Sequence, residues 1–238
     1  MQEKNKKAIF IKSNKENLDF KKIKESGIDA VIFKVSYGLN PYKKELKNNI
    51  KKAKESGLLI GVYKELNEKS SANLQALLYS RILKKYKLDL YPILSIESNK
   101  NNLNKKEFSD KCLKFMEIVK KYINNECVIK TSTSFANDNL DMRLRDNKFW
   151  SIDEDKSMFK HNKIWDNWDC FKCNKKHTIS GINNKFELGE IKNTIIKNKF
   201  INDTLIKDKC TNNNCNCGHS HGNNNCSHNN CGHNHCNY

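Results

Sequence analysis

The chain has no long apolar run. No segment of the 238 residues approaches 18 consecutive apolar side chains, the length that a membrane-spanning helix needs, so we expect no membrane span. The apolar run at residues 8–11 is also too short to be the core of a signal peptide. These features predict synthesis in the cytoplasm, with delivery by lysis or another route if the protein acts outside the cell.

Phosphate-binding and base-reading motifs are also missing. No glycine-rich loop follows any apolar run, which argues against nucleotide binding. The chain carries 44 Lys and Arg against 27 Asp and Glu, a formal net charge of +17, which permits an anionic partner such as a nucleic acid, a wall polymer or a membrane surface. The excess is nearly all lysine, which lacks the forked donors that read bases. We therefore expect no specific nucleic-acid partner.

What the chain does have is a regular alternation of apolar runs and amphipathic segments. Helical periodicity marks residues 18–27, 43–56, 71–86 and 105–123, and Gly27 and Gly57 stop the first two. Short apolar runs at residues 8–11, 30–36, 58–63, 91–98 and 127–131 indicate buried strands. Two further strand-like runs, residues 149–152 and 163–165, have only loops between them. The pattern predicts an α/β fold, an incomplete TIM-like (β/α)5β3 barrel.

Several segments together resemble the family 25 glycoside hydrolases, the muramidase-type lysozymes that cut peptidoglycan. They are residues 19–34, residues 49–58 leading to Gly61-Val62-Tyr63, residues 131–150 with Phe149-Trp150, and residues 181–188. The resemblance covers roughly residues 8 to 192. It implies a barrel that needs no cofactor and whose partner is peptidoglycan or a related glycan.

The resemblance also implies a set of catalytic acids, and this chain has only part of it. The family's Asp-x-Glu at the end of the fourth strand is Ser95-Ile96-Glu97 here, and its first-strand Asp is Phe10. Its fifth-strand Tyr is Lys130, and its closing-strand Asp is matched by Glu187. Glycoside hydrolysis requires a proton donor and a second carboxylate. We expect Glu97 and Glu187 to be the catalytic acids and the activity to be weakened or lost.

A second interpretation is a non-catalytic glycan-binding or structural protein of a spore coat or wall layer. Lys34, Tyr63, Ser95 and Trp165 are the candidate substrate-binding residues, because they fall on strands that would face the barrel mouth. Packing of the barrel is the alternative role for their side chains.

The C-terminal segment differs from the rest in composition. Residues 210–238 contain six Cys and five His and no charged side chain, so they cannot bury an apolar core. Their spacing is typical of zinc or another soft metal, and the candidate ligands are Cys210, Cys215, Cys217, His219, His221, Cys226, His228, Cys231, His233, His235 and Cys236. Intermolecular disulfides are the competing interpretation, and a low-complexity repeat without a role is a third.

The expected organisation is a disordered N-terminus over residues 1–7, a barrel over residues 8–200, and a linker with a disordered Cys/His-rich tail over residues 201–238. Cys170 and Cys173, with His177 nearby, form a Cys-x-x-Cys within the barrel region. This motif could be a small metal site or a disulfide.

Overall fold

The computed structural model describes residues 4–12, 18–37, 44–179 and 185–197. These residues belong to one compact unit that ends at Lys197. The predicted tail and all eleven of its candidate metal ligands lie outside the described residues.

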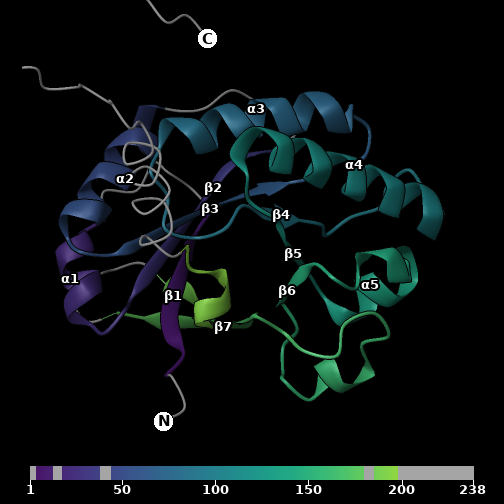
Figure 1. Ribbon diagram of the computed structural model, residues 1–238. Coiled ribbons are helices and arrows are strands. Elements are labelled where there is room, and N and C mark those ends of the chain that lie inside the picture. The colour runs from purple at the N-terminus through teal and green to yellow at the C-terminus, as the bar shows by residue number, and fades with distance from the viewer. Residues whose placement is uncertain (1–3, 13–17, 38–43, 180–184, 198–238) are drawn as a thin grey trace, which may run out of the picture. The chain divides into compact units, whose positions relative to one another are not determined.

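Eight strands form a closed barrel in chain order (Figure 1). They are β1 (Lys6–Ile11), β2 (Ala30–Tyr37), β3 (Leu59–Glu65), β4 (Ile93–Ser95), β5 (Val128–Thr131), β6 (Lys148–Ser151), β7 (Cys170–Thr178) and β8 (Lys185–Ile191). Strands β1 to β7 run parallel, and β8 closes the barrel by pairing antiparallel with both β7 and β1. The predicted (β/α)5β3 architecture is confirmed, and the barrel is incomplete only in its helices.

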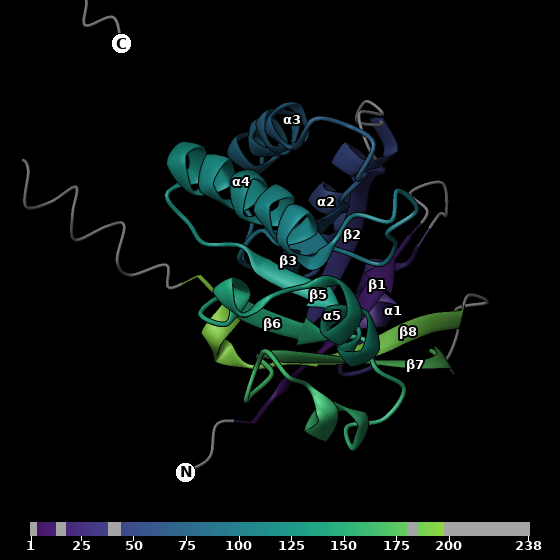
Figure 2. The ribbon, with the colours of Figure 1, turned by 90° about the vertical axis from the view of Figure 1, so that its right-hand side faces the viewer.

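Within the described residues, an α-helix follows each of the first five strands. These helices are α1 (Phe20–Glu25), α2 (Lys44–Glu55), α3 (Ala72–Lys85), α4 (Lys105–Ile123) and the short α5 (Thr133–Asn139), with 3-10 turns η1 (Met142–Leu144), η2 (Met158–His161) and η3 (Asn193–Ile195). Gly27 and Gly57 follow α1 and α2 at φ angles of 83° and 75°, the left-handed conformation that glycine adopts without strain. Figure 2 shows α3 and α4 together on one side of the barrel. Strands β7 and β8 form the opposite side of the barrel wall.

Two details of the predicted strands are wrong. Residues 163–165 form no strand; β7 begins at Cys170 instead. Strand β7 contains three lysines, so it lacks the apolar run by which the first six strands can be recognised. At the other end, β1 begins at Lys6, so Lys6 and Lys7 belong to the barrel and not to the expected disordered N-terminus.

The core has two layers because the side chains of each strand alternate between the two faces of the barrel wall. One layer lies between the strands and the helices and includes Phe33, Tyr79 and Phe149. The other fills the barrel itself and includes Phe10, Tyr63 and Trp150. The inner layer therefore lies directly below the polar side chains at the ends of the strands.

Candidate active site at the carboxyl ends of the strands

The polar side chains of the barrel interior gather where the parallel strands end, which is where barrel enzymes place their chemistry. By the two-residue alternation of each strand, these side chains share the inner face with the inner core. We call this set the mouth residues; they are Lys12, Lys34, Tyr63, Glu65, Ser95, Glu97, Lys130, Lys172 and Glu187.

Glu97 is held by two neighbours from adjacent strands. Ser95 Oγ donates to Glu97 Oε1 at 2.6 Å, and the Lys130 ammonium forms an ion pair with the same carboxylate oxygen. Lys130 Nζ also donates to Ser95 Oγ at 2.9 Å. Ser95 and Lys130 are direct partners in the register of β4 and β5, so the pairing of these strands fixes all three groups in one triangle.

The three side chains differ in their exposure to solvent. Ser95 is fully buried and the Lys130 side chain is 3% exposed, whereas the Glu97 side chain is 42% exposed. The carboxylate therefore caps a buried ammonium and stands between it and the solvent.

This arrangement keeps Glu97 ionised. Burial raises the pKa of Glu97, but the charge of Lys130 and the hydrogen bonds from Lys130 and Ser95 outweigh it and lower the pKa to about 2. Burial is the main influence on Lys130 and lowers the pKa of its ammonium to about 8, against the attraction of Glu97. Both groups are consequently charged at neutral pH.

Glu187 on β8 is held in a similar way by two lysines. Its carboxylate lies 2.8 Å from Lys12 Nζ and 2.6 Å from Lys172 Nζ. Burial raises the pKa of Glu187, but the hydrogen bonds from these lysines lower it overall. Phe10 is the register partner of Glu187 and packs edge-on against Trp150.

Lys34 and Tyr63 both lie at the mouth, as expected. Lys34 Nζ pairs with Glu65 at 2.6 Å, and Tyr63 is buried below the Lys130 ammonium, which lies 5.1 Å from the centre of its ring. Burial, and then the charges of Glu65, Glu97 and Glu187, raise the pKa of the Tyr63 phenol. The Tyr63 phenol therefore remains protonated at neutral pH.

Trp165 is not where the sequence analysis placed it. It belongs to the outer core, where its ring stacks on Phe149 with centroids 4.3 Å apart. Its Nε1 donates to the Asn147 carbonyl at 2.9 Å. Phe149 alternates with the inward-facing Trp150 along β6, so Trp165 lies outside the barrel wall and its role is packing.

The Cys-x-x-Cys motif is only partly visible. Cys170 is fully buried in the inner core, and its thiol is free; the side chains of Cys173 and His177 lie outside what the structure describes. Burial raises the pKa of the Cys170 thiol, which disfavours the thiolate that binds metals. Among the described residues, no group of three or more His, Cys, Asp or Glu side chains could hold a metal ion.

Sequence reasoning missed several of the mouth residues. Lys12, Glu65 and Lys172 were not singled out, and Lys130 was noted only as a departure from the family pattern. Glu65 follows Tyr63 by two positions, so the strand period alone could have identified it. Lys172 was missed because β7 was not recognised as a strand.

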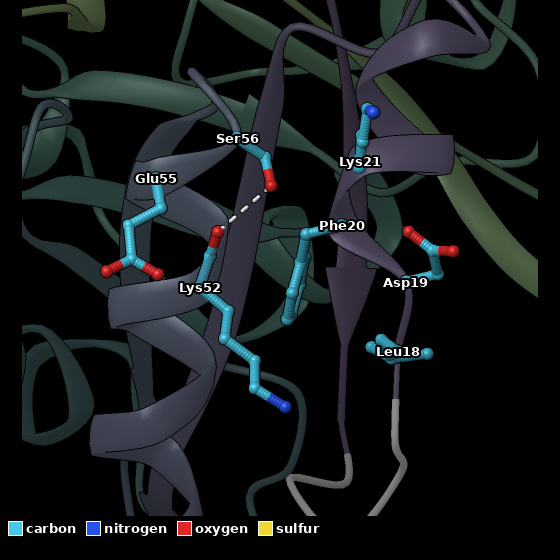
Figure 3. A pocket seen from close by; sticks show the side chains of 7 residues that line it. All are labelled: Leu18, Asp19, Phe20, Lys21, Lys52, Glu55 and Ser56. Carbon is cyan, nitrogen blue, oxygen red and sulfur yellow. Dashed lines mark hydrogen bonds between the residues drawn. The ribbon is translucent and has the colours of Figure 1, made fainter.

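A surface pocket of about 490 Å³ lies elsewhere, between α1 and α2 (Figure 3). Its lining residues are Leu18, Asp19, Phe20, Lys21, Lys52, Glu55 and Ser56. The Phe20 ring projects into the space between the two helices, and Ser56 Oγ donates to the Lys52 carbonyl at 3.0 Å. None of the mouth residues lines this pocket.

Comparison with solved structures shows the same fold. A family 25 glycosyl hydrolase from Bacillus anthracis matches at a TM-score of 0.69 and 16% identity, over 80% of this chain and 90% of that one. A lysozyme from Streptomyces coelicolor matches at 0.69 and 16%, over 79% and 92%. The spore cortex lytic enzyme of Clostridium perfringens matches at 0.70 and 15%, over 82% and 71%.

Comparison by sequence gives two results. No curated protein is significantly similar to this chain. The sequence model of "Glycosyl hydrolases family 25" matches residues 9–182, which is most of the barrel and more than half of the chain. The chain belongs to glycosyl hydrolase family 25.

Proposed function

We propose that this barrel is a peptidoglycan-binding member of family 25 whose hydrolytic activity is greatly weakened or lost. The observation that carries the proposal is the contact of Glu97 with Lys130 and Ser95. Relatives in the family include a bacterial lysozyme and a spore cortex lytic enzyme, and a related autolysin from Streptococcus pneumoniae was solved with a synthetic peptidoglycan ligand.

The first supporting argument concerns the proton. A general acid must hold a proton at the working pH in order to donate it to the leaving oxygen. With a pKa of about 2, Glu97 is protonated in roughly one molecule in 10⁵ at pH 7. A glycosidase raises the pKa of its acid, and the ammonium of Lys130 has the opposite effect here.

The second argument concerns the other carboxylate. Ser95 carries no charge that could stabilise the positive sugar ring of the transition state, and Phe10 replaces another acid of the family pattern. Glu187 is already neutralised by Lys12 and Lys172. Loss of one catalytic group commonly costs a factor of about 10³ or more in rate, so we infer little or no hydrolysis.

Glycan binding does not need this proton. The mouth still presents exposed charged side chains, among them Lys12 and Glu97, and charged groups can hydrogen-bond to sugars. The site of action that fits this function is the cell wall or a spore coat, reached after synthesis in the cytoplasm. In that setting the Cys/His-rich tail would contribute metal binding, with zinc or another soft ion, or disulfide cross-links.

The test measures binding and hydrolysis separately on purified peptidoglycan. We expect the wild-type protein to co-sediment with the insoluble polymer but to leave the turbidity of its suspension unchanged. Glu97→Gln should behave like the wild type in the turbidity assay, and Glu117→Gln, which alters an exposed acid on α4, serves as the matched control. Clearing by the wild type that disappears in Glu97→Gln would overturn the loss of activity.

A variant designed to regain hydrolytic activity extends the same test. The double variant Ser95→Asp with Lys130→Tyr restores two residues of the family pattern and removes the ammonium that holds Glu97 ionised. We expect the pKa of Glu97 to rise and some clearing to appear. If neither the wild type nor this variant co-sediments with peptidoglycan, glycan binding is contradicted and a structural coat or wall-layer protein is favoured.

A further inference from the structure

Helices α1 to α4 all end on the side of the barrel opposite the mouth. Strands β1 to β5 run parallel, so a helix that joins two of them runs back and ends where the next strand begins. Each of the four helices has two lysines in its last turn; they are Lys22, Lys24, Lys52, Lys54, Lys84, Lys85, Lys120 and Lys121. Positive charge therefore surrounds the amino ends of these strands.

Stabilisation of the helix dipoles explains only part of this pattern. Cations stabilise the carboxyl end of a helix, and acids stabilise its amino end to a similar degree. The first turns of the same four helices hold only two acids, Glu45 and Glu107. The lysines therefore exceed what the dipoles alone would select, and the excess positive charge lies at the helix ends opposite the mouth.

The ends of α2, α3 and α4 form one continuous surface. Lys54 Nζ donates to the Lys87 carbonyl, which joins the end of α2 to the segment after α3. Lys84 Nζ lies 5.3 Å from the centre of the Tyr122 ring on α4, and Figure 2 shows α3 and α4 side by side. We call the exposed lysines of this surface the basic patch; they are Lys52, Lys54, Lys84, Lys85, Lys87, Lys120 and Lys121.

Few acids compensate the charge of the basic patch. Lys120 pairs with Glu126 at 3.3 Å, and Glu55 at the end of α2 pairs with Lys51, outside the patch, at 3.8 Å. The printed contacts of Lys54 and Lys84 are instead a carbonyl and an aromatic ring, which are neutral. Within the part of the chain that the structure describes, no ion pair involves Lys52, Lys54, Lys84, Lys87 or Lys121. The patch therefore retains a local positive charge that an anion would neutralise.

We propose that the basic patch binds a flexible anionic polymer whose charges are phosphodiesters. Lysine is a point charge on a flexible stem with rotatable donors, so it can follow the phosphates of a flexible chain. The exposed apolar side chain of the patch is Tyr122, and Lys84 lies over its ring, so the patch offers little apolar surface to a lipid bilayer. The choice of a wall-linked polymer over a nucleic acid rests on the proposed function.

The basic patch and the mouth lie at opposite ends of the barrel, so the two ligands do not compete for one site. A chain bound to the polymer through its helix ends keeps its mouth open to a glycan. Binding at both sites would raise the overall affinity for a wall that carries both ligands, because the second contact forms within the first complex. The inference therefore adds a second means of attachment to the protein.

The experiment measures binding of the full chain to fluorescently labelled poly(glycerol phosphate), by anisotropy over a series of salt concentrations. The triple variant Lys54→Gln, Lys84→Gln and Lys121→Gln removes charge from each helix end of the patch. We expect it to bind at least about tenfold more weakly than the wild type at low salt, and the slope of log affinity against log salt to fall by about 2. Arginine at the same three positions keeps the charge and should keep the binding.

A matched control removes the same net charge elsewhere. Lys69→Gln, Lys100→Gln and Lys106→Gln alter exposed lysines in the two loops after β3 and β4 and in the first turn of α4, and this variant should bind the polymer nearly as well as the wild type. Equal weakening in both triple variants would show that net charge and not the patch attracts the polymer, and would overturn the inference.

The wild type alone gives a second decision. Absence of binding to poly(glycerol phosphate), or tighter binding to single-stranded DNA or to anionic lipid vesicles, would also overturn the inference. Co-sedimentation with peptidoglycan that has been stripped of its anionic polymers reports separately on glycan binding at the mouth, so failure of one proposal can be distinguished from failure of the other.

Discussion

An ammonium next to a carboxylate stabilises the charged form of that carboxylate, and this is how Lys130 acts on Glu97. The same glutamate in an apolar site would have a raised pKa and could donate a proton. The protonation state of Glu97 is thus determined by its neighbour Lys130.

The low pKa of Glu97 predicts how stability depends on pH. An unfolded glutamate has a pKa of about 4.3, whereas folded Glu97 has a pKa of about 2. Its ionised form therefore contributes stability above about pH 4.3, and this contribution is lost as the pH falls toward 2. We expect Glu97→Gln to be less stable than the wild type at pH 7 and the two proteins to converge near pH 2.

Urea unfolding across this pH range measures the effect. Solvent screening reduces its size because the Glu97 side chain is 42% exposed, so the convergence of the curves is the diagnostic feature. Glu117→Gln should follow the wild type throughout. Curves for wild type and Glu97→Gln that stay parallel from pH 7 to pH 2 would contradict the ion pair.

At the level of elements, Tyr79 ties helix α3 to the two strands that lead to the mouth. Its hydroxyl donates to the Val62 carbonyl of β3 at 2.9 Å and accepts from the Ile93 amide of β4 at 3.0 Å. Tyr79 is fully buried, so water cannot replace it. The position of the three-residue strand β4, and with it Ser95, depends on this hydroxyl.

Tyr79→Phe should therefore destabilise the barrel. The substitution leaves the buried Ile93 amide without its partner, and an unsatisfied buried group costs about 1–3 kcal/mol. Chemical unfolding measures the loss. Tyr122→Phe, at a position 44% exposed on α4, should change the free energy of unfolding by no more than about 0.5 kcal/mol. Equal changes in the free energy of unfolding for the two substitutions would show that the hydrogen bonds of the Tyr79 hydroxyl have no special role.

Helices α1 to α4 and the first six strands could be predicted because each carries its own local pattern, whereas the short α5 was not among the predicted segments. Helices α2 and α4 have apolar residues at helical spacing, and β2 and β5 are short buried runs. Strand β7 could not be predicted in this way, because its stability comes from pairing with β6 and β8. The misplaced Trp165 follows from the same error: its segment is apolar because it packs on the outside of β6.

For the whole molecule, closure of the barrel depends on β8, and a side chain at Gly189 on that strand would be tightly crowded. A Cβ added at Gly189 would lie 3.0 Å from the Phe171 carbonyl oxygen and 3.1 Å from Phe10 Cε2. We expect Gly189→Val to cost about 1–3 kcal/mol through overpacking, measured by thermal or urea unfolding. Lys185→Val, at an exposed position on the same strand, is the control and should have a small effect. An unchanged melting temperature in Gly189→Val would show that β8 can shift freely.

The chemistry of the mouth is a property of the whole barrel and could be predicted only in part. Alternation places Tyr63, Ser95 and Glu97 on the inner face once their strands are known. The register between strands then places Lys130 opposite Ser95 and Glu187 opposite Phe10. Register depends on packing across the complete barrel, so the ion pairs could not be derived from the local sequence.

The triangle of Ser95, Glu97 and Lys130 also limits how this protein can evolve. Replacing Lys130 alone leaves Ser95 and Glu97 without their shared donor, and replacing Glu97 alone leaves a buried ammonium without its counter-ion. Each first step is costly, although a concerted change of two residues need not be. Single replacements within the triangle are therefore disfavoured, and if the proposed loss of activity is correct, a return to acid catalysis requires substitutions at more than one of these residues together.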